Sequence, residues 1–269
     1  SQEYIDRSGH DFFARKTQGE GVYEQSYTKD QLDSFSDSLS KEISICKQNK
    51  KRILSYFTSS DDEYHAIDGA PNRYREWKDQ ISAIKSISKV AKELGFFLVV
   101  RVHPNLKNKS IPEQNRWGLL NDYITEQGFY CIGQNDLDST YKLILESDMI
   151  ISAGSTVGIE SIYLGKPSIV ICDCKYDSII KSVKLCPSEQ TIKEILLDTS
   201  AFDSPKSSDA YIYGAWAMGY APSHKYFKAT DAISVLAGRM EDGTRVASTG
   251  LTQNIINMVK KIMPNKYLE

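Results

Sequence analysis

Small and hydroxyl-bearing residues stand together at Ser152–Thr156, which reads Ser-Ala-Gly-Ser-Thr between an apolar run and a short helical pattern. Small residues let a ligand approach the backbone, and the unpaired N–H groups at a helix start attract anions. The pattern therefore predicts an anion site suited to phosphate, with Glu160 one turn further on to accept hydrogen bonds from ribose hydroxyls. A cap formed by Ser155 or Thr156, with Glu160 complementing the helix dipole, explains the same pattern without a ligand.

An imidazole follows a second apolar run at His103, and Pro104 comes directly after it. Proline has no N–H and ends the strand ladder, which leaves the imidazole facing the crevice beyond the strand ends. A histidine there can donate to a phosphate oxygen or protonate a leaving phosphate. A structural histidine is the alternative, but two neighbouring strand ends with phosphate-compatible groups favour the functional interpretation.

Polar residues also follow the first predicted strand at Thr58–Ser60 and the third at Gln134 and Asn135. We take His103 and Glu160 as the candidate catalytic residues. The candidate ligand-binding residues are Thr58, Ser59, Ser60, Arg101, His103, Pro104, Asn105, Ser152, Gly154, Ser155, Thr156 and Glu160.

Metal chemistry is not favoured by the acidic or cysteine residues. Asp136 and Asp138 have the acid-x-acid spacing of some metal-diphosphate sites, yet Asp138 is better explained as the N-cap of the next helix. Cys172 and Cys174 lack a second pair or a nearby histidine, which disfavours zinc. The motifs of dinucleotide oxidoreductases, P-loop enzymes and α/β-hydrolases are missing from the sequence.

The elements that position these residues alternate between strand and helix. Five strands are expected at Ile53–Phe57, Phe96–Val102, Phe129–Ile132, Met149–Ser152 and Ser168–Cys172. Helices are expected between them, at about Trp77–Leu94, Pro112–Gln127, Asp138–Glu146 and Ser155–Leu164, with one more at 188–198. This alternation predicts an α/β fold, a doubly wound, Rossmann-like parallel sheet in which ligands bind beyond the carboxyl ends of the strands.

We expect this sheet domain to span residues 50–200, between two extensions. Residues 1–49 form a lead-in segment, irregular over 1–28, followed by an amphipathic helix at Asp30–Gln48. Residues 201–269 form a helical extension with patches at Asp209–Met218 and Gln253–Ile262.

Composition limits the class of protein. The chain of 269 residues is nearly balanced in charge, with a pI of about 6.1, which argues against nucleic acid as a partner. Five scattered cysteines indicate a reducing cytoplasm, and no apolar run reaches membrane-spanning length. Since the sequence begins at Ser1 without methionine, we expect a piece of a longer chain.

Four further stretches of the sequence are FTSSDDEY, RVHPNL, DSTYKLILESDMIISAGSTVGIESIYLGKPSIVI and YIYG. Together they resemble the capsular polysaccharide biosynthesis family, over about residues 50–215. This family includes Kdo transferases that act on bacterial capsule and lipopolysaccharide glycans. The resemblance implies the C-terminal half of a GT-B glycosyltransferase, which holds a nucleotide sugar such as CMP-Kdo, with His103, Ser155 and Thr156 on the donor phosphate. It also implies no cofactor or metal at the reacting centre, and a glycan or glycolipid acceptor.

A GT-B enzyme has two Rossmann-like domains, and this chain has room for one. An N-terminal acceptor domain or a partner chain would then supply the acceptor site and the base, or transfer activity has been lost. We expect a cytoplasmic protein, with peripheral contact at the inner face of the membrane left open. The alternatives are a UDP-sugar epimerase or hydrolase of the same architecture, a glycerophosphate transferase and a non-catalytic nucleotide-binding module.

Overall fold

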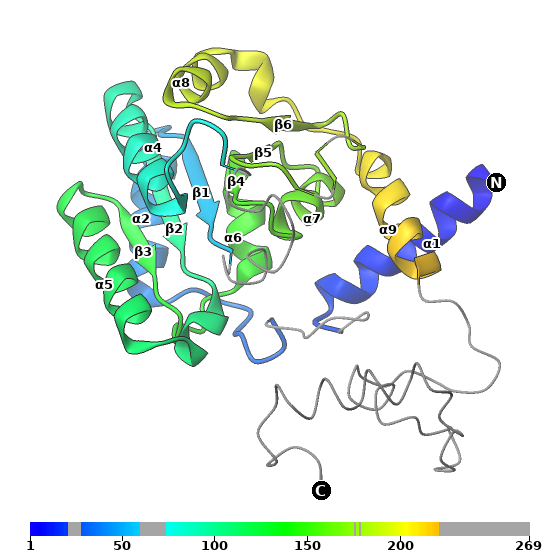
Figure 1. The fold of residues 1–269 in the computed structure, drawn as a ribbon, viewed down its shortest axis with the longest axis horizontal. Coiled ribbons are helices and arrows are strands. Elements are labelled where there is room, and N and C mark those ends of the chain that lie inside the picture. The colour runs from blue at the N-terminus through cyan, green and yellow to red at the C-terminus, as the bar shows by residue number, and fades with distance from the viewer. Residues whose placement is uncertain (21–27, 60–73, 175, 178, 221–269) are drawn as a thin grey trace, which may run out of the picture. The chain divides into compact units, whose positions relative to one another are not determined.

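A six-stranded, fully parallel sheet forms the centre of the fold, in the order β3-β2-β1-β4-β5-β6 (Figure 1). The strands are β1 Ile53–Phe57, β2 Phe97–Arg101, β3 Tyr130–Ile132, β4 Met149–Ser152, β5 Ser168–Val170 and β6 Val183–Leu185. The predicted doubly wound α/β fold is confirmed, and β6 is a strand that the sequence analysis missed.

The computed structural model describes residues 1–20, 28–59, 74–174, 176–177 and 179–220. The predicted site residue Ser60 and the predicted helical patch Gln253–Ile262 lie outside these residues. The chain divides into a unit Ser1–Met218, which contains the sheet, and a unit Gly219–Glu269.

The order of the strands reverses between β1 and β4. The chain passes from β1 outward to β2 and β3, then returns to place β4 on the other side of β1. Phe57 is in register with Arg101 on β2 and with Ser152 on β4, so the carboxyl ends of these three strands are level. The residues that follow them therefore meet at one edge, at the topological switch point of the sheet.

Helices cover the sheet close to where the periodicity predicts. They are α2 Asp37–Gln48, α4 Gln80–Leu94, α5 Ile111–Glu126, α6 Thr140–Glu146, α7 Val157–Tyr163 and α8 Glu189–Leu197. In α4, Asp79 and Ser82 form a capping box at the start and Gly95 ends the helix with a φ of 78°. Two 3₁₀ segments, η3 Thr199–Phe202 and η4 Ser207–Ala210, precede α9 Tyr211–Tyr220.

The prediction of a helix from Asp30 is wrong for its first part, because α2 begins at Asp37. Leu32, which continues the apolar spacing, is 54% exposed, and its N–H donates to the carbonyl oxygen of Leu137 at 2.8 Å. Pairing with the segment after β3 thus replaces the first helical turn.

The irregular lead-in predicted for residues 1–28 is also wrong, since Gln2–Thr17 form helix α1. Phe12 and Phe13 of this helix are buried in a second apolar cluster with Tyr213 of α9. A Cβ on Gly214 would lie 2.8 Å from the carbonyl oxygen of Gly9, so glycines allow close approach of the two backbones. Tertiary contacts, which the local sequence does not reveal, stabilise α1.

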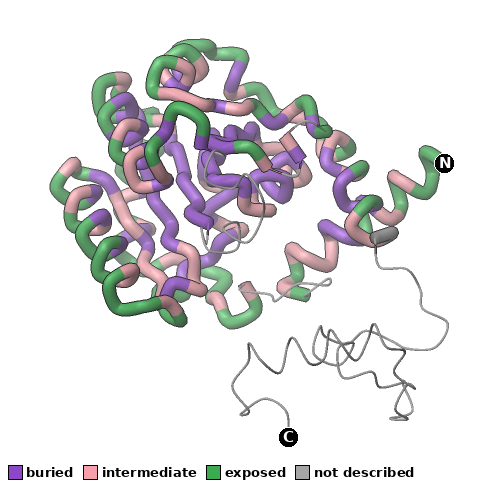
Figure 2. The backbone as a smooth tube through the Cα atoms, in the orientation of Figure 1, coloured by how far each residue is buried: buried purple, intermediate pink, exposed green. Residues whose placement is uncertain are grey.

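The main apolar core lies along the sheet, where β1 and β2 are buried at every residue (Figure 2). Strands covered on both faces explain the near-continuous apolar runs in the sequence. Among the described residues, no helix has the length and apolar character needed to cross a membrane.

Candidate functional site

Ser59 joins the segments after β1 and β4 across the switch point. Its hydroxyl donates to the carbonyl oxygen of Ala153 at 2.9 Å. The side chain of Gln80, the first residue of α4, accepts from the Ser59 N–H at 2.8 Å and donates to the Ser59 carbonyl oxygen at 3.0 Å. Gln80 is fully buried and fixes the backbone of Ser59, a role that sequence analysis did not anticipate.

Thr58 and His103 join the segments after β1 and β2. The His103 N–H donates to the Thr58 hydroxyl oxygen at 2.7 Å. The N–H of Asn105 donates to Nδ1 of the His103 ring at 3.2 Å. Because Nδ1 is an acceptor, the neutral ring carries its proton on Nε2 and can donate from that atom.

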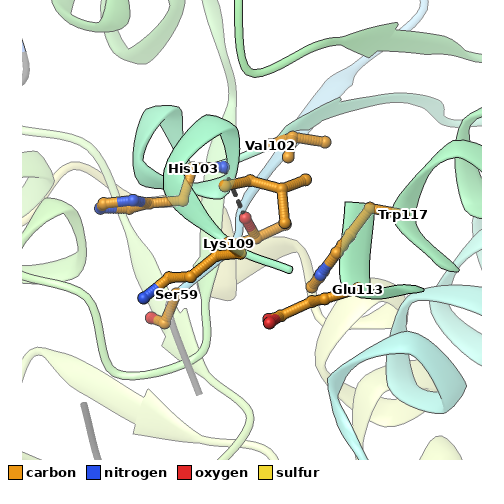
Figure 3. Close-up of a pocket in the computed structure, with 8 residues that line it drawn as sticks. Ser59, Val102, His103, Lys109, Glu113 and Trp117 are labelled. Atoms are coloured by element: carbon orange, nitrogen blue, oxygen red, sulfur yellow. Dashed lines mark hydrogen bonds between the residues drawn. The ribbon is translucent and has the colours of Figure 1, made fainter. Parts of the chain in front are cut away.

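A cavity opens beside these residues and contains about 210 Å³ of empty space, open in part to solvent. In Figure 3, the His103 ring lies on one side, Lys109 extends toward Ser59, and Glu113 and Trp117 form the opposite wall. The complete lining is Thr58, Ser59, Val102, His103, Leu106, Lys109, Glu113 and Trp117. Sequence reasoning missed five of these. Val102 was assigned only to the predicted strand, and the last four follow no strand directly but lie on the 3₁₀ segment, on α5 and between the two.

Pro104 and Asn105 belong to the 3₁₀ segment η2 Pro104–Asn108 and do not line this cavity. The Asn105 side-chain oxygen accepts from Nδ2 of Asn108 at 3.1 Å. These two predicted site residues therefore shape the segment that holds His103.

The segment after β4 turns at Gly154, whose φ of 79° suits glycine. Ser155 follows, and its carbonyl oxygen accepts from the Tyr176 hydroxyl at 2.5 Å. Thr156 occupies the N-cap position of α7 without a side-chain capping bond. The Ser155 hydroxyl oxygen instead accepts from the N–H of Val157, the first residue of α7, at 3.4 Å, so of the two caps considered from sequence the one by Ser155 is present. Ser152 is fully buried, and a Cβ on Gly158 would lie 2.9 Å from its hydroxyl oxygen, which places that hydroxyl against α7 inside the fold.

Glu160 is 3% exposed and lies in a network with Lys16 of α1. The Lys16 ammonium lies 3.2 Å from Glu160 Oε1 and 3.2 Å from the Thr156 hydroxyl oxygen. The Tyr141 hydroxyl lies 2.9 Å from Glu160 Oε2 and 2.9 Å from the carbonyl oxygen of Lys16. Burial, and then the Glu160 carboxylate, raise the pKa of Tyr141 above its ordinary value, so this hydroxyl stays protonated. Lys16 and Tyr141 are further residues that sequence analysis missed.

Arg101 ends β2 and is 3% exposed. Burial lowers the pKa of its guanidinium to about 10, against the opposing effect of Asp138 and Asp136. The group therefore stays charged at neutral pH.

Asp138 is not the N-cap of α6, contrary to the expectation from sequence. Ser139 is the N-cap, and its side chain accepts from the Lys142 N–H. Asp138 Oδ1 instead accepts from the N–H of Ser36 at 2.6 Å, ahead of α2. Within the part of the chain that the structure describes, no cluster of three or more histidine, cysteine or acidic residues could hold a metal ion.

No protein-family model and no curated protein sequence matches the chain. Similar solved structures include a UDP-GlcNAc 2-epimerase from Neisseria meningitidis bound to UDP-GlcNAc, at 15% identity and a TM-score of 0.39. KpsC, a beta Kdo 2,4 transferase from Thermosulfurimonas dismutans, matches at 12% identity and a TM-score of 0.42. The wall teichoic acid polymerase TagF matches at 14% identity and a TM-score of 0.32.

The match to the epimerase covers 68% of this chain and 48% of the epimerase chain. The match to KpsC covers 80% of this chain and 55% of the KpsC chain, and the match to TagF covers 97% of this chain and 48% of the TagF chain. The chain thus spans about half the length of these proteins.

Proposed function

We propose that the chain binds a nucleotide sugar at the switch point of its sheet and acts as the donor-binding domain of a GT-B glycosyltransferase. One observation carries this proposal: the segments after β1, β2 and β4 are joined there by two hydrogen bonds. These run from Ser59 to Ala153 and from His103 to Thr58. In open parallel sheets this is where phosphate-bearing ligands bind.

The chemistry of the site suits a leaving phosphate. In glycosyl transfer, an acceptor hydroxyl attacks the anomeric carbon while the bond to the phosphate oxygen breaks, and negative charge develops on the phosphate. The His103 ring, whose Nδ1 accepts from Asn105, presents Nε2–H as a donor to that oxygen. Lys109 lines the same cavity and adds positive charge.

The cavity also offers surface for a part of the donor beyond its phosphate. Val102, Leu106 and Trp117 supply apolar walls, while Glu113 and Ser59 supply acceptors for hydroxyl groups. We propose a CMP-linked sugar such as CMP-Kdo as donor and a bacterial surface polysaccharide or glycolipid as acceptor, without a metal. A second domain or a partner chain would supply the acceptor site and the catalytic base, in the cytoplasm or at the inner face of the membrane.

Thermal unfolding in the presence of CMP, CDP, UDP or GDP tests this proposal. A nucleotide that binds only the folded protein adds about 2.7 kcal/mol of stability at 100 times its Kd. We expect CMP to raise the Tm most, whereas UDP would indicate an epimerase and CDP a glycerophosphate transferase.

His103→Ala should remove most of the nucleotide-dependent rise in Tm, measured against the Tm of the same variant without ligand, because the lost ring also accepts from the Asn105 N–H. His10→Ala is the control, because His10 lies on α1, packs edge-on against Tyr163 and Tyr211 and does not line the cavity. If no nucleotide raises the Tm, or if His103→Ala responds as the wild type does, the proposed site is wrong.

A further inference from the structure

Arg101 carries a buried charge whose terminal nitrogens lack a hydrogen-bond partner. Among the described residues, the buried side-chain atoms without a partner are Arg101 Nη1 and Nη2, Ser152 Oγ and Ser168 Oγ. Of these only the guanidinium is charged. A buried charge without a partner is costly, so an unpaired guanidinium calls for an explanation.

The neighbouring carboxylates do not supply that partner. Asp138 Oδ1 accepts from the Ser36 N–H at 2.6 Å, and Asp136 Oδ2 accepts from the Gly133 N–H at 2.7 Å. Both carboxylates act on Arg101 through space, yet burial outweighs them and lowers the pKa of the guanidinium. The N–H groups on Nη1 and Nη2 of Arg101 can therefore donate hydrogen bonds to a ligand.

The position of Arg101 links it to the candidate site. It is the last residue of β2, in register with Phe57 on β1 and with Ile132 on β3, and His103 follows two residues later. The backbone of Arg101 thus lies at the carboxyl edge of the sheet, next to the cavity but not among the residues that line it. Because only 3% of Arg101 is exposed, a ligand reaches it only after local opening at this edge.

We propose that Arg101 forms an oxyanion subsite, in which its guanidinium binds a carboxylate or phosphate group of the ligand. A guanidinium presents two parallel N–H groups to such a group and forms paired, charge-assisted hydrogen bonds with it. This inference rests on the proposed function for its ligand class, an anionic nucleotide sugar. It adds that the ligand carries an oxyanion which His103 does not bind.

The test compares thermal unfolding in sodium phosphate, sodium acetate and sodium chloride at equal ionic strength. We expect phosphate or acetate to raise the wild-type Tm by about 3 °C over chloride. A larger rise in phosphate assigns a phosphate group to the subsite, and a larger rise in acetate assigns a carboxylate. Equal Tm values in all three salts would overturn the proposal.

Arg101→Met removes the charge and keeps apolar volume, so it should abolish the anion-specific rise. Its Tm in chloride should equal or exceed that of the wild type, because an unpaired buried charge is gone. Lys89→Met, on an exposed position of α4, controls for net charge and should keep the rise. A Tm in chloride that falls further for Arg101→Met than for Lys89→Met would show that Arg101 is already paired, and would contradict the proposal.

Arg101→Lys keeps the positive charge but loses the two parallel N–H groups of the guanidinium. It should fold normally and show a smaller anion-specific rise in Tm. If Arg101→Lys keeps the full rise in Tm, recognition of the anion by paired hydrogen bonds is wrong.

The nucleotide series separates the proposed subsite from the proposed function. If the nucleotide-dependent rise in Tm is unchanged in Arg101→Met, the proposed function stands and the subsite is wrong. If phosphate raises the Tm only when Arg101 is present and no nucleotide raises it, the subsite stands and the proposed function is wrong.

Discussion

At the scale of single residues, the orientation of His103 follows from the residues next to it. Pro104 has no N–H, so the first N–H available after the histidine is that of Asn105, which donates to Nδ1. The Thr58 hydroxyl holds the His103 backbone from the neighbouring strand. Two local contacts therefore fix both the place and the tautomer of the imidazole.

Gly158 lies against buried hydroxyls beneath α7. A Cβ at this position would lie 2.9 Å from the Ser152 hydroxyl oxygen and closer still to the Tyr176 hydroxyl. We expect Gly158→Ala to lower the free energy of unfolding by about 1 to 3 kcal/mol, measured by urea denaturation. Gly118→Ala is the control, because Gly118 is exposed within α5 and has open space, and it should add about 0.5 to 1 kcal/mol. A Gly158→Ala protein as stable as the wild type would contradict this packing.

The residues of the site were only partly predictable from the sequence. Thr58, Ser59 and His103 could be found because each follows an apolar strand, and strand ends meet at one edge. Lys109 and Trp117 could not be found from the sequence, because their place in the cavity depends on how η2 and α5 pack against the end of the sheet.

At the scale of elements, α1 and α7 are joined by a nearly buried ion pair. The Lys16 and Glu160 side chains are 13% and 4% exposed, with 3.2 Å between ammonium and carboxylate. Such a pair fixes the end of α1 beside Thr156, because a buried charge that loses its partner is costly.

Glu160→Gln should therefore lower the free energy of unfolding by about 3 kcal/mol or more, because it leaves the Lys16 ammonium without its carboxylate. Lys16→Met combined with Glu160→Gln should recover part of that loss. Glu20→Gln breaks the exposed pair with Arg15, whose side chains are 43% and 52% exposed, and should cost no more than about 1 kcal/mol. Equal effects of Glu160→Gln and Glu20→Gln would show that the Lys16 pair does not anchor α1.

The elements of the sheet were more predictable than those at its edge. Continuous apolar runs identify β1 and β2 because both faces are covered. Strand β6 has only Val183 buried and Lys184 exposed, so its sequence carries little strand signal. Helix α1 depends on Gly9 and on aromatic partners far along the chain, which no local pattern contains.

At the scale of the whole molecule, the strand order determines where a ligand can bind. The reversal between β1 and β4 brings three loops together, and the site residues of those loops come from segments up to about 100 residues apart. The predicted alternation of strand and helix was sufficient to place these loops at one edge. The contacts that join them, through Gln80 and Ala153, required the three-dimensional structure.

Backbone amide exchange with and without CMP, followed by mass spectrometry, tests the central claim of binding at the switch point. The account predicts slower exchange on nucleotide addition in the segments 58–59, 102–106 and 153–157, which follow β1, β2 and β4. It predicts no change in α2 and α8, which neither line the cavity nor directly follow β1, β2 or β4. Unchanged exchange in all three segments under saturating nucleotide, or protection confined to other elements, would contradict it.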